Sequence, residues 1–288
     1  MANNLAAGKG EAWASMLQEV LREAFVGSQI ANTKFEGLFD GNDTVHFPKL
    51  AKITSQDLAS SYSSVTVQDL VETDETFVLD TRKQSAFEIS NEDMKELRVS
   101  PETQAIKDMA EAFASDYDTA ILGQYANAAY TIDAGNVGGT GGTAATLTKS
   151  NIYQFIVETG KTLDENNVPS SDRFIVFSPA EKALLLQAPE LIRSTEYGDK
   201  LVTGGFMGTV DDFKIYWSNN LTDVASVKHA LAGAGKPVSF AANIKPSVEI
   251  TPSQYRDSFV SLVKAQTKFG VKTFTEGANR LADLQIAS

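Results

Sequence analysis

Two histidines, His46 and His229, are the only side chains in this 288-residue sequence whose ordinary pKa lies near neutral pH, and the sequence has no cysteine. No disulfide, thiolate metal site or cysteine nucleophile can therefore form. Neither histidine belongs to a His-Glu-x-x-His zinc motif, and there is no Gly-x-Ser-x-Gly elbow. His46 lies in an alternating, strand-like run, so we expect it to be a half-buried structural residue. We expect His229 to be structural as well.

Two glycine-containing segments match nucleotide-binding loops only in part. Residues 139–144 fit a loose dinucleotide pattern, but a long predicted helix precedes them where that pattern needs a strand. Gly160-Lys161-Thr162 has the tail of a phosphate loop, but the first glycine of that motif is replaced by Phe155. Adjacent acids such as Asp211-Asp212 and Glu92-Asp93 are typical of solvated turns. We therefore expect no catalytic, cofactor-binding or metal-binding residues, and no enzyme.

The charge balance argues against a protein whose main surface binds nucleic acid. There are 25 basic and 37 acidic residues, a formal net charge of −12, although a basic inner patch remains compatible with that total. Apolar residues make up 42% and charged residues 22%, as in an ordinary globular chain. No run approaches the roughly 18 apolar residues of a membrane helix, and the first residues do not have the pattern of a signal peptide. We expect no membrane partner.

The first third of the sequence predicts an amphipathic helix over residues 10–25, a strand over residues 44–48 and then an unusual acidic segment. The helix could pack on its own subunit or dock on a neighbour. From Ile53 to Thr81 there are six acids and no lysine or arginine, with β-rich runs at residues 65–67 and 76–79. These runs predict a long hairpin with little core of its own, which needs another surface to lie on. The alternative is a mobile, solvated acidic hairpin.

The middle and the end of the sequence predict an α+β fold. Ser100-Pro101 begins the strongest helix, whose apolar stripe runs to about Tyr130, roughly 45 Å. A loop rich in glycine and threonine follows at 134–146. Further on, the pattern predicts a helix near 152–163, a strand at 173–177, a helix begun by the capping box Ser178-Pro179-Ala180-Glu181, and strands at 213–217, 238–240, 259–265 and 271–274. No parallel βαβ unit repeats.

The order of these parts resembles the HK97-fold major capsid proteins of tailed bacteriophages. The most specific stretch is the strand, cap and helix start at 173–181, followed by a glycine turn at 204–210 and by a strand that ends in Ser218-Asn219-Asn220-Leu221. Residues 43–48 resemble the strand that leads into the family's extended loop, and residues 260–274 resemble its last peripheral strands. The likeness covers nearly the whole chain.

The resemblance implies both a fold and a function. It divides the chain into an N-terminal arm (1–43), an extended β-hairpin loop (44–98), a peripheral domain with the long spine helix and a linker (99–147), an α/β axial domain (148–245) and returning peripheral strands (246–288). It implies a major capsid protein that self-assembles into an icosahedral shell around the double-stranded DNA genome of a tailed bacteriophage. A bacterial encapsulin shell is the alternative within the same fold. A surface-layer protein or adhesin is disfavoured by the missing secretion signal.

The resemblance also implies partners. The chain is expected to bind itself, in hexamers and pentamers, and to bind packaged DNA only non-specifically. Only about forty residues precede the first predicted strand, so we expect a separate scaffolding protein, besides a portal and a possible decoration protein. Assembly is expected in the host cytoplasm, and the mature location is the virion. The acidic loop is expected to lie on basic groups of a neighbour, drawn partly from Arg256, Lys264, Lys268, Lys272 and Arg280.

Some shells of this family close covalently, by attack of a loop lysine on a neighbour's asparagine. Residues 53–81 hold no lysine, and only Lys52 and Lys83 flank them, where we expect both to face their own subunit. Asn219, Asn220 and Asn243 are possible acceptors, but an acceptor needs a donor amine. The sequence therefore predicts a shell that is held non-covalently.

Overall fold

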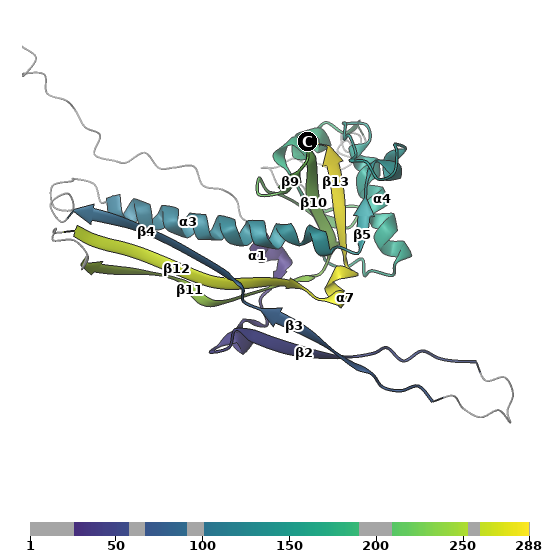
Figure 1. The fold of residues 1–288 in the computed structure, drawn as a ribbon. Coiled ribbons are helices and arrows are strands. Elements are labelled where there is room, and N and C mark those ends of the chain that lie inside the picture. The colour runs from purple at the N-terminus through teal and green to yellow at the C-terminus, as the bar shows by residue number, and fades with distance from the viewer. Residues whose placement is uncertain (1–25, 58–66, 91–100, 190–208, 253–259, 288) are drawn as a thin grey trace, which may run out of the picture.

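The computed structural model describes residues 26–57, 67–90, 101–189, 209–252 and 260–287. The predicted helix at 10–25, the cap Ser100, the pair Glu92-Asp93 and most of the glycine turn at 204–210 lie outside these ranges. Within them the chain forms an elongated sheet under a long helix, a compact α/β part and a projecting two-stranded hairpin (Figure 1).

The elongated sheet has four strands in the order β1 (Ala31–Asn32), β11 (Val238–Pro252), β12 (Val260–Thr273) and β4 (Thr81–Ser90). β12 pairs antiparallel with both β11 and β4. The two β-like runs predicted near the C-terminus are thus parts of one long strand. The helix α3 (Pro101–Leu122) lies along this sheet, and its Met109 and Phe113 are buried together with Ala265 of β12 (Figure 1).

The helix α3 is shorter than predicted. It ends at Leu122, after about 33 Å, and a tighter 3₁₀ turn η3 (Gly123–Asn127) follows. The prediction to Tyr130 was wrong because the backbone becomes extended at Ala128 and residues Tyr130–Ile132 form strand β5, which pairs parallel with β13. The apolar stripe itself is confirmed, since Met109, Phe113 and Ile121 are buried.

The compact part is built on a mixed sheet of seven strands. Their order is β5, β13 (Leu281–Ala287), β10 (Val227–Ala234), β6 (Arg173–Phe177), β8 (Phe213–Trp217) and β7 (Thr209–Val210), with β9 (Thr222–Val224) paired to β10. β6 and β8 are parallel and are joined through α5 (Pro179–Leu186), which makes one βαβ unit. The predicted capping box is confirmed: Ser178 accepts from the Ala180 amide, and Glu181 accepts from the Ser178 amide.

Both faces of this sheet are buried, as the continuous apolar run of β6 requires. Ile175 and Phe177 face a core completed by α5 and by α4 (Ile152–Glu165). Phe174 and Val176 face a second core, which contains residues of α1 (Gly27–Ile30), the end of α3 and β11. The second core therefore joins the compact part to the elongated sheet.

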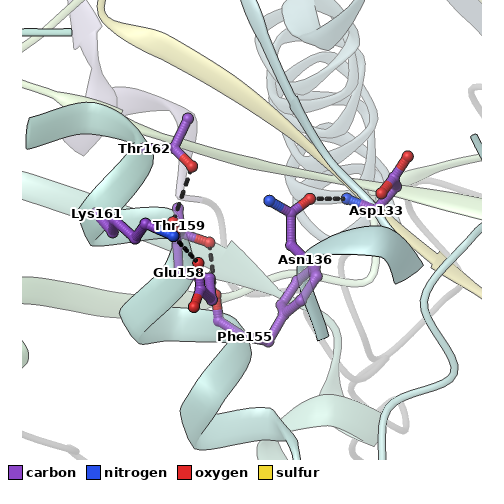
Figure 2. A network of polar contacts seen from close by, with 7 residues as sticks. All are labelled: Asp133, Asn136, Phe155, Glu158, Thr159, Lys161 and Thr162. Carbon is purple, nitrogen blue, oxygen red and sulfur yellow. Dashed lines mark hydrogen bonds and ion pairs between the residues drawn. The ribbon is translucent and has the colours of Figure 1, made fainter. Parts of the chain in front are cut away.

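Lys161 and Thr162, and the turn that precedes residues 139–144, make polar contacts with nearby residues of the chain (Figure 2). Lys161 pairs with Glu158 of its own helix at 3.1 Å, and the Thr162 hydroxyl donates to the Glu158 carbonyl oxygen. The loop after β5 is a short 3₁₀ turn, η4 (Ala134–Val137), closed by a capping box of Asp133 and Asn136. Because α4 begins only at Ile152, no helix follows the glycines directly and the dinucleotide pattern fails.

The hairpin consists of β2 (Thr44–Leu50) and β3 (Glu72–Val78), which pair antiparallel and project away from the rest of the molecule (Figure 1). We call residues 44–78 the hairpin. The predicted strand at 44–48 is confirmed, and the run at 76–79 falls in β3 up to Val78. Val67, in contrast, belongs to no strand, so the hairpin that we expected from the runs at 65–67 and 76–79 is formed by β2 and β3 instead. In the described ranges, no helix has both the length and the apolar character needed to cross a bilayer.

Candidate assembly interface

The root of the hairpin is held by an aromatic cluster drawn from four parts of the chain. Phe39 of η2 (Glu36–Phe39) and Phe77 of β3 are fully buried and meet edge to face, with ring centroids 4.9 Å apart. Phe47 of β2 lies 4.9 Å from both Phe35 and Phe274. Such edge-to-face pairs add about 0.5–1.5 kcal/mol each to the burial of the rings. The cluster therefore fixes the direction in which the hairpin leaves the body.

Ion pairs also hold the root of the hairpin, the end at which β2 and β3 meet the rest of the molecule. The Lys49 ammonium of β2 lies 2.9 Å from Glu276 of α7 (Thr275–Ala278) and 3.9 Å from Glu75 of β3. The Lys268 ammonium of β12, which is almost buried, pairs with Asp43, the residue directly before β2. Since Lys49 and Lys268 lie on different elements, the two pairs connect the hairpin to the C-terminal region at separate points.

These contacts shift the pKa of the acids in a consistent direction. The hydrogen bond from Lys268 lowers the pKa of Asp43, and the hydrogen bond from Lys49 lowers the pKa of Glu276. Burial works against ionisation of Glu75, but hydrogen bonds from Thr275, helped by Lys49 and Lys272, leave its pKa lowered. Because these pKa values are lowered, the carboxyl groups of Asp43, Glu75 and Glu276 are ionised in the folded protein at neutral pH.

Beyond the root, the hairpin presents apolar and acidic side chains to solvent. Val67 is 84% exposed, Ile53 62% and Leu70 61%. Outside the paired strands, the Gln68 side chain holds the two halves together through hydrogen bonds with the Thr54 amide and carbonyl groups. A two-stranded ribbon that leaves such residues in water gains little stability by itself, so covering these residues would stabilise the hairpin.

A buried carboxylate fixes the place where the N-terminal segment meets the body. Asp118 of α3 is 1% exposed. Its Oδ1 accepts from the amides of Val26 and Gly27 at 3.0 and 2.5 Å, and its Oδ2 accepts from the Ser218 hydroxyl and the Asn220 amide group at 2.9 and 3.2 Å. We call this set the Asp118 clamp. Four donors take the place of water, which allows the charge to be buried.

The two histidines differ in their surroundings. His46 is exposed, which corrects our expectation of a half-buried residue: the alternation of β2 turns Val45 and Phe47 toward the aromatic cluster and His46 outward, where its Nδ1 meets Asp74. His229 is structural, as predicted, because it is held by Asp283 at 2.9 Å and stacks on Tyr125.

The other candidate residues do not converge on one site. Asp211 and Asp212 form an exposed turn between β7 and β8, as predicted, with φ of 48° and 65°. Lys83 faces its own subunit, also as predicted, and pairs with Asp116 of α3 at 3.1 Å. Lys52, in contrast, does not face its own subunit as we expected, because it lies exposed on the projecting hairpin. No group of acidic or histidine side chains suited to a metal ion occurs in the described part of the chain.

Two of the three asparagines considered as acceptors, Asn220 and Asn243, have local roles. Asn220 donates to Asp118, whereas Asn219 is exposed. Asn243 donates weakly to the carbonyl oxygen of Asn42. Of the C-terminal bases, Lys268 serves the root of its own hairpin, and Arg256 lies outside the described residues.

Sequence reasoning missed the Asp118 clamp and the Lys268–Asp43 pair. Asp118 lies beside the apolar stripe of α3, and an acidic residue in an amphipathic helix is ordinarily assigned to the face that contacts water. Its inward position on α3, between Phe113 and Ile121, was the only available signal. The groups that bind it lie 91 to 102 residues away in the sequence, and no local pattern predicts such contacts.

A protein-family model described as phage capsid protein matches residues 72–275. No curated protein sequence matches the chain.

Solved structures show the same fold over nearly the whole chain. A chain from Mycobacterium phage Che8 has a TM-score of 0.81 at 21% identity, covering 98% of each chain. A chain from the capsid of Cyanophage P-SCSP1u has a TM-score of 0.79 at 14% identity and covers 100% of this chain and 96% of that one. A chain from the capsid of Myoviridae Phage XM1 has a TM-score of 0.70 at 14% identity over 99% of each chain.

Proposed function

This chain belongs to the phage capsid protein family, and from that premise we propose how its parts build a shell. It is a major capsid protein with an HK97-like α+β fold, a structural component of the virion whose copies associate with one another. The family match does not favour the encapsulin alternative. We propose that the shell encloses double-stranded DNA, held by non-specific contacts, and that the chain has no enzymatic activity.

The hairpin carries the proposal, because it is the part of the subunit that is least complete alone. Six of the large apolar side chains that are exposed fall within it: Leu50, Ile53, Val67, Leu70, Val71 and Val78. Laid on a neighbouring copy, these residues would lose their contact with water, at a gain of roughly 25 cal/mol for each Å² buried. A contact between different surfaces of two copies closes a ring when it is repeated.

The strand pairing supports a division of the chain close to the expected one. We propose an arm (1–43), an extended loop (44–98), a peripheral domain (99–147 and 246–288) and an axial domain (148–245), with two refinements. β5 and β13 pair within the seven-stranded sheet and so belong with the axial domain. β4 pairs with β12, so the part of the extended loop that projects freely is the hairpin.

The remaining partners follow from the mode of assembly. We propose that a separate scaffolding protein, a portal and a decoration protein complete the particle, and that assembly takes place in the host cytoplasm. The packaged DNA would meet a chain of net charge −12 and be held by confinement rather than by a dedicated binding surface.

Trimming the hairpin tests the proposal. Replacing residues 53–69 with an Asn-Gly turn keeps the backbone hydrogen bond from the Ala51 amide to the Val71 carbonyl group and leaves the aromatic cluster intact. We expect a folded subunit, with an unchanged circular dichroism spectrum and a melting temperature within about 4 °C of the parent, because the removed residues add little to its core. Electron microscopy should show no closed shells.

The matched control replaces the same residues with a Gly/Ser linker of equal length, which keeps the reach and removes the side chains. We expect this variant to fail in assembly as well. Shells formed by either variant, or unfolding of the trimmed subunit, would show that the hairpin does not act between copies.

A further inference from the structure

Asp40-Gly41 is the only place in the sequence where an aspartate or an asparagine directly precedes a glycine. The side-chain carboxyl group of an aspartate can be attacked by the backbone nitrogen of the next residue, which closes a five-membered succinimide ring. Glycine favours this reaction because it has no Cβ to shield its nitrogen and because its backbone rotates more freely than that of other residues. The sequence therefore contains one residue pair of the type at which aspartate isomerises.

Both reacting groups of this pair are free in the structure. Asp40 and Gly41 are exposed in the turn between η2 and β2. Among the described residues, the Asp40 carboxylate has no hydrogen bond or ion pair, and the Gly41 amide donates to no carbonyl group. The ψ angle of Asp40 is 103°, so the peptide group that follows must rotate before the Gly41 nitrogen can reach the side chain. Gly41 has room for this rotation, because a Cβ built on it would meet nothing within 4 Å.

Asp133 is a contrasting case in the same chain. It precedes another small residue, Ala134, but its carboxylate accepts hydrogen bonds from the amides of Gly135 and Gly142 at 2.8 and 2.5 Å. The Ala134 amide donates to the carbonyl oxygen of Thr143 at 3.0 Å. The carboxyl group and the nitrogen that would react are thus both held in place, whereas the corresponding groups of Asp40 and Gly41 are not.

We propose that Asp40 isomerises spontaneously, so that in aged protein the backbone runs through the side chain of this residue. The Gly41 nitrogen forms a bond with Cγ of Asp40, and the hydroxyl of the protonated carboxyl group leaves with the amide proton as water. A second water then opens the ring. Breaking the bond between nitrogen and Cγ restores aspartate, whereas breaking the bond between nitrogen and the backbone carbonyl carbon gives isoaspartate. Both products have the same mass, and no oxidant or reductant takes part.

The turn that contains Asp40 lies between two fixed points of the hairpin root. On one side, Phe39 is fully buried in the aromatic cluster. On the other side, Asp43 pairs with Lys268, and its carbonyl oxygen accepts from the Leu79 amide at 2.9 Å. Isoaspartate adds a methylene group to the backbone between these points, which displaces the turn and weakens the contacts of Asp43. Isomerisation therefore loosens the hairpin root, whatever surface the hairpin binds.

Ageing the purified protein in warm, mildly acidic buffer made with heavy-oxygen water tests the chemistry. After digestion in ordinary water, we expect the peptide that contains Asp40 to give two chromatographic peaks of the same sequence, with heavy oxygen incorporated at Asp40. An isoaspartyl methyltransferase should methylate only the isomerised form. The peptide that contains Asp133 is the internal control and should gain neither label. An Asp40 peptide without heavy oxygen, or equal labelling of the Asp133 peptide, would overturn the proposal.

Two variants connect the reaction to its consequence. Asp40→Glu keeps the charge at an exposed position but would have to close a larger ring, so it should lose the modification. Asp40→Asn should form the same ring with loss of ammonia and become labelled sooner than the parent. On ageing, hydrogen exchange of the Leu79 amide should become faster in the parent and stay unchanged in Asp40→Glu. If the parent isomerises but its Leu79 exchange does not change, the link to the hairpin root is overturned.

Discussion

Replacing Asp118 with asparagine should loosen the junction between the N-terminal segment and the body. Asparagine keeps the shape of the side chain, but it has one oxygen and one amide group where the carboxylate has two acceptors. With its oxygen toward the Val26 and Gly27 amides, its amide group would face the amide group of Asn220, which is also a donor. With the opposite orientation, the backbone amides of Val26 and Gly27 would face the amide group of the asparagine, which is itself a donor.

The magnitude follows from the four hydrogen bonds of the Asp118 clamp. Each hydrogen bond to a charged group contributes about 1.5–3 kcal/mol net, and each neutral bond about 0.5–1.5 kcal/mol. Asparagine weakens three bonds and loses the fourth, but it also removes the cost of burying a charge. We therefore expect a loss of about 3 kcal/mol, out of a total stability of about 5–15 kcal/mol. The subunit should remain folded.

The assay is thermal melting of the trimmed subunit, in which shell assembly does not contribute. A loss of about 3 kcal/mol should lower the melting temperature by roughly 6–12 °C. Hydrogen exchange gives the local signal, because the amides of Val26 and Gly27 would be held by a neutral oxygen in place of a charged one and should exchange at least tenfold faster.

Asp116→Asn is the matched control. Asp116 lies on the same helix but pairs at the surface with Lys83, a contact worth about 0–1 kcal/mol, so it should melt within about 4 °C of the parent. If Asp118→Asn melted like this control and its Val26 and Gly27 amides kept their protection, the clamp would not hold the N-terminal segment and the reasoning would be refuted.

Three further predictions concern the hairpin root and the shell. Gly270→Ala should cost about 1–3 kcal/mol, because the added methyl group would overlap the Val78 carbonyl oxygen, whereas Gly37→Ala faces open space and should be neutral in the same melting assay. Because the pKa values of Asp43 and Glu276 are lowered in the folded state, their contribution to stability is complete above about pH 5 and is lost as the pH falls through those lowered values. The melting temperature should therefore drop below about pH 4, and Glu276→Gln should reduce that drop; a pH-independent melt between pH 5 and 3 would contradict the assignment. Mature particles boiled in SDS should give a single band near 31 kDa, and a ladder of multimers would show that a covalent link forms, with Lys52 and Lys83 the first residues to replace.

Sequence patterns predicted the parts of this fold that short segments determine. The capping box at Ser178 and the apolar positions of α4 act within one or two helical turns, so their residue types are sufficient. The hairpin was predictable only in part. Its outer residues lack a core, which is visible in the sequence, but its paired strands are β2 and β3 and not the runs at 65–67 and 76–79.

Features that depend on distant partners were not predictable. The end of α3 is set by the pairing of Tyr130–Ile132 with Ala282–Leu284, which overrides an apolar stripe that would allow a longer helix. His46 is exposed because the aromatic cluster takes the other face of β2, and nothing near His46 specifies which face that is.

The position of β13 has a consequence for the order of events during synthesis. This strand lies between β5 and β10 in the sheet, but β5 ends at Ile132 and β10 at Ala234, so both are made long before residues 281–287 leave the ribosome. Until then each has an unpaired edge, and Ala230 and Ala232 lack the neighbours Leu284 and Ala282 with which they pair. Such edges invite pairing with other nascent chains. A chain interrupted before Leu281 is therefore prone to aggregate, and the core around the seven-stranded sheet becomes complete only after residues 281–287 have been translated.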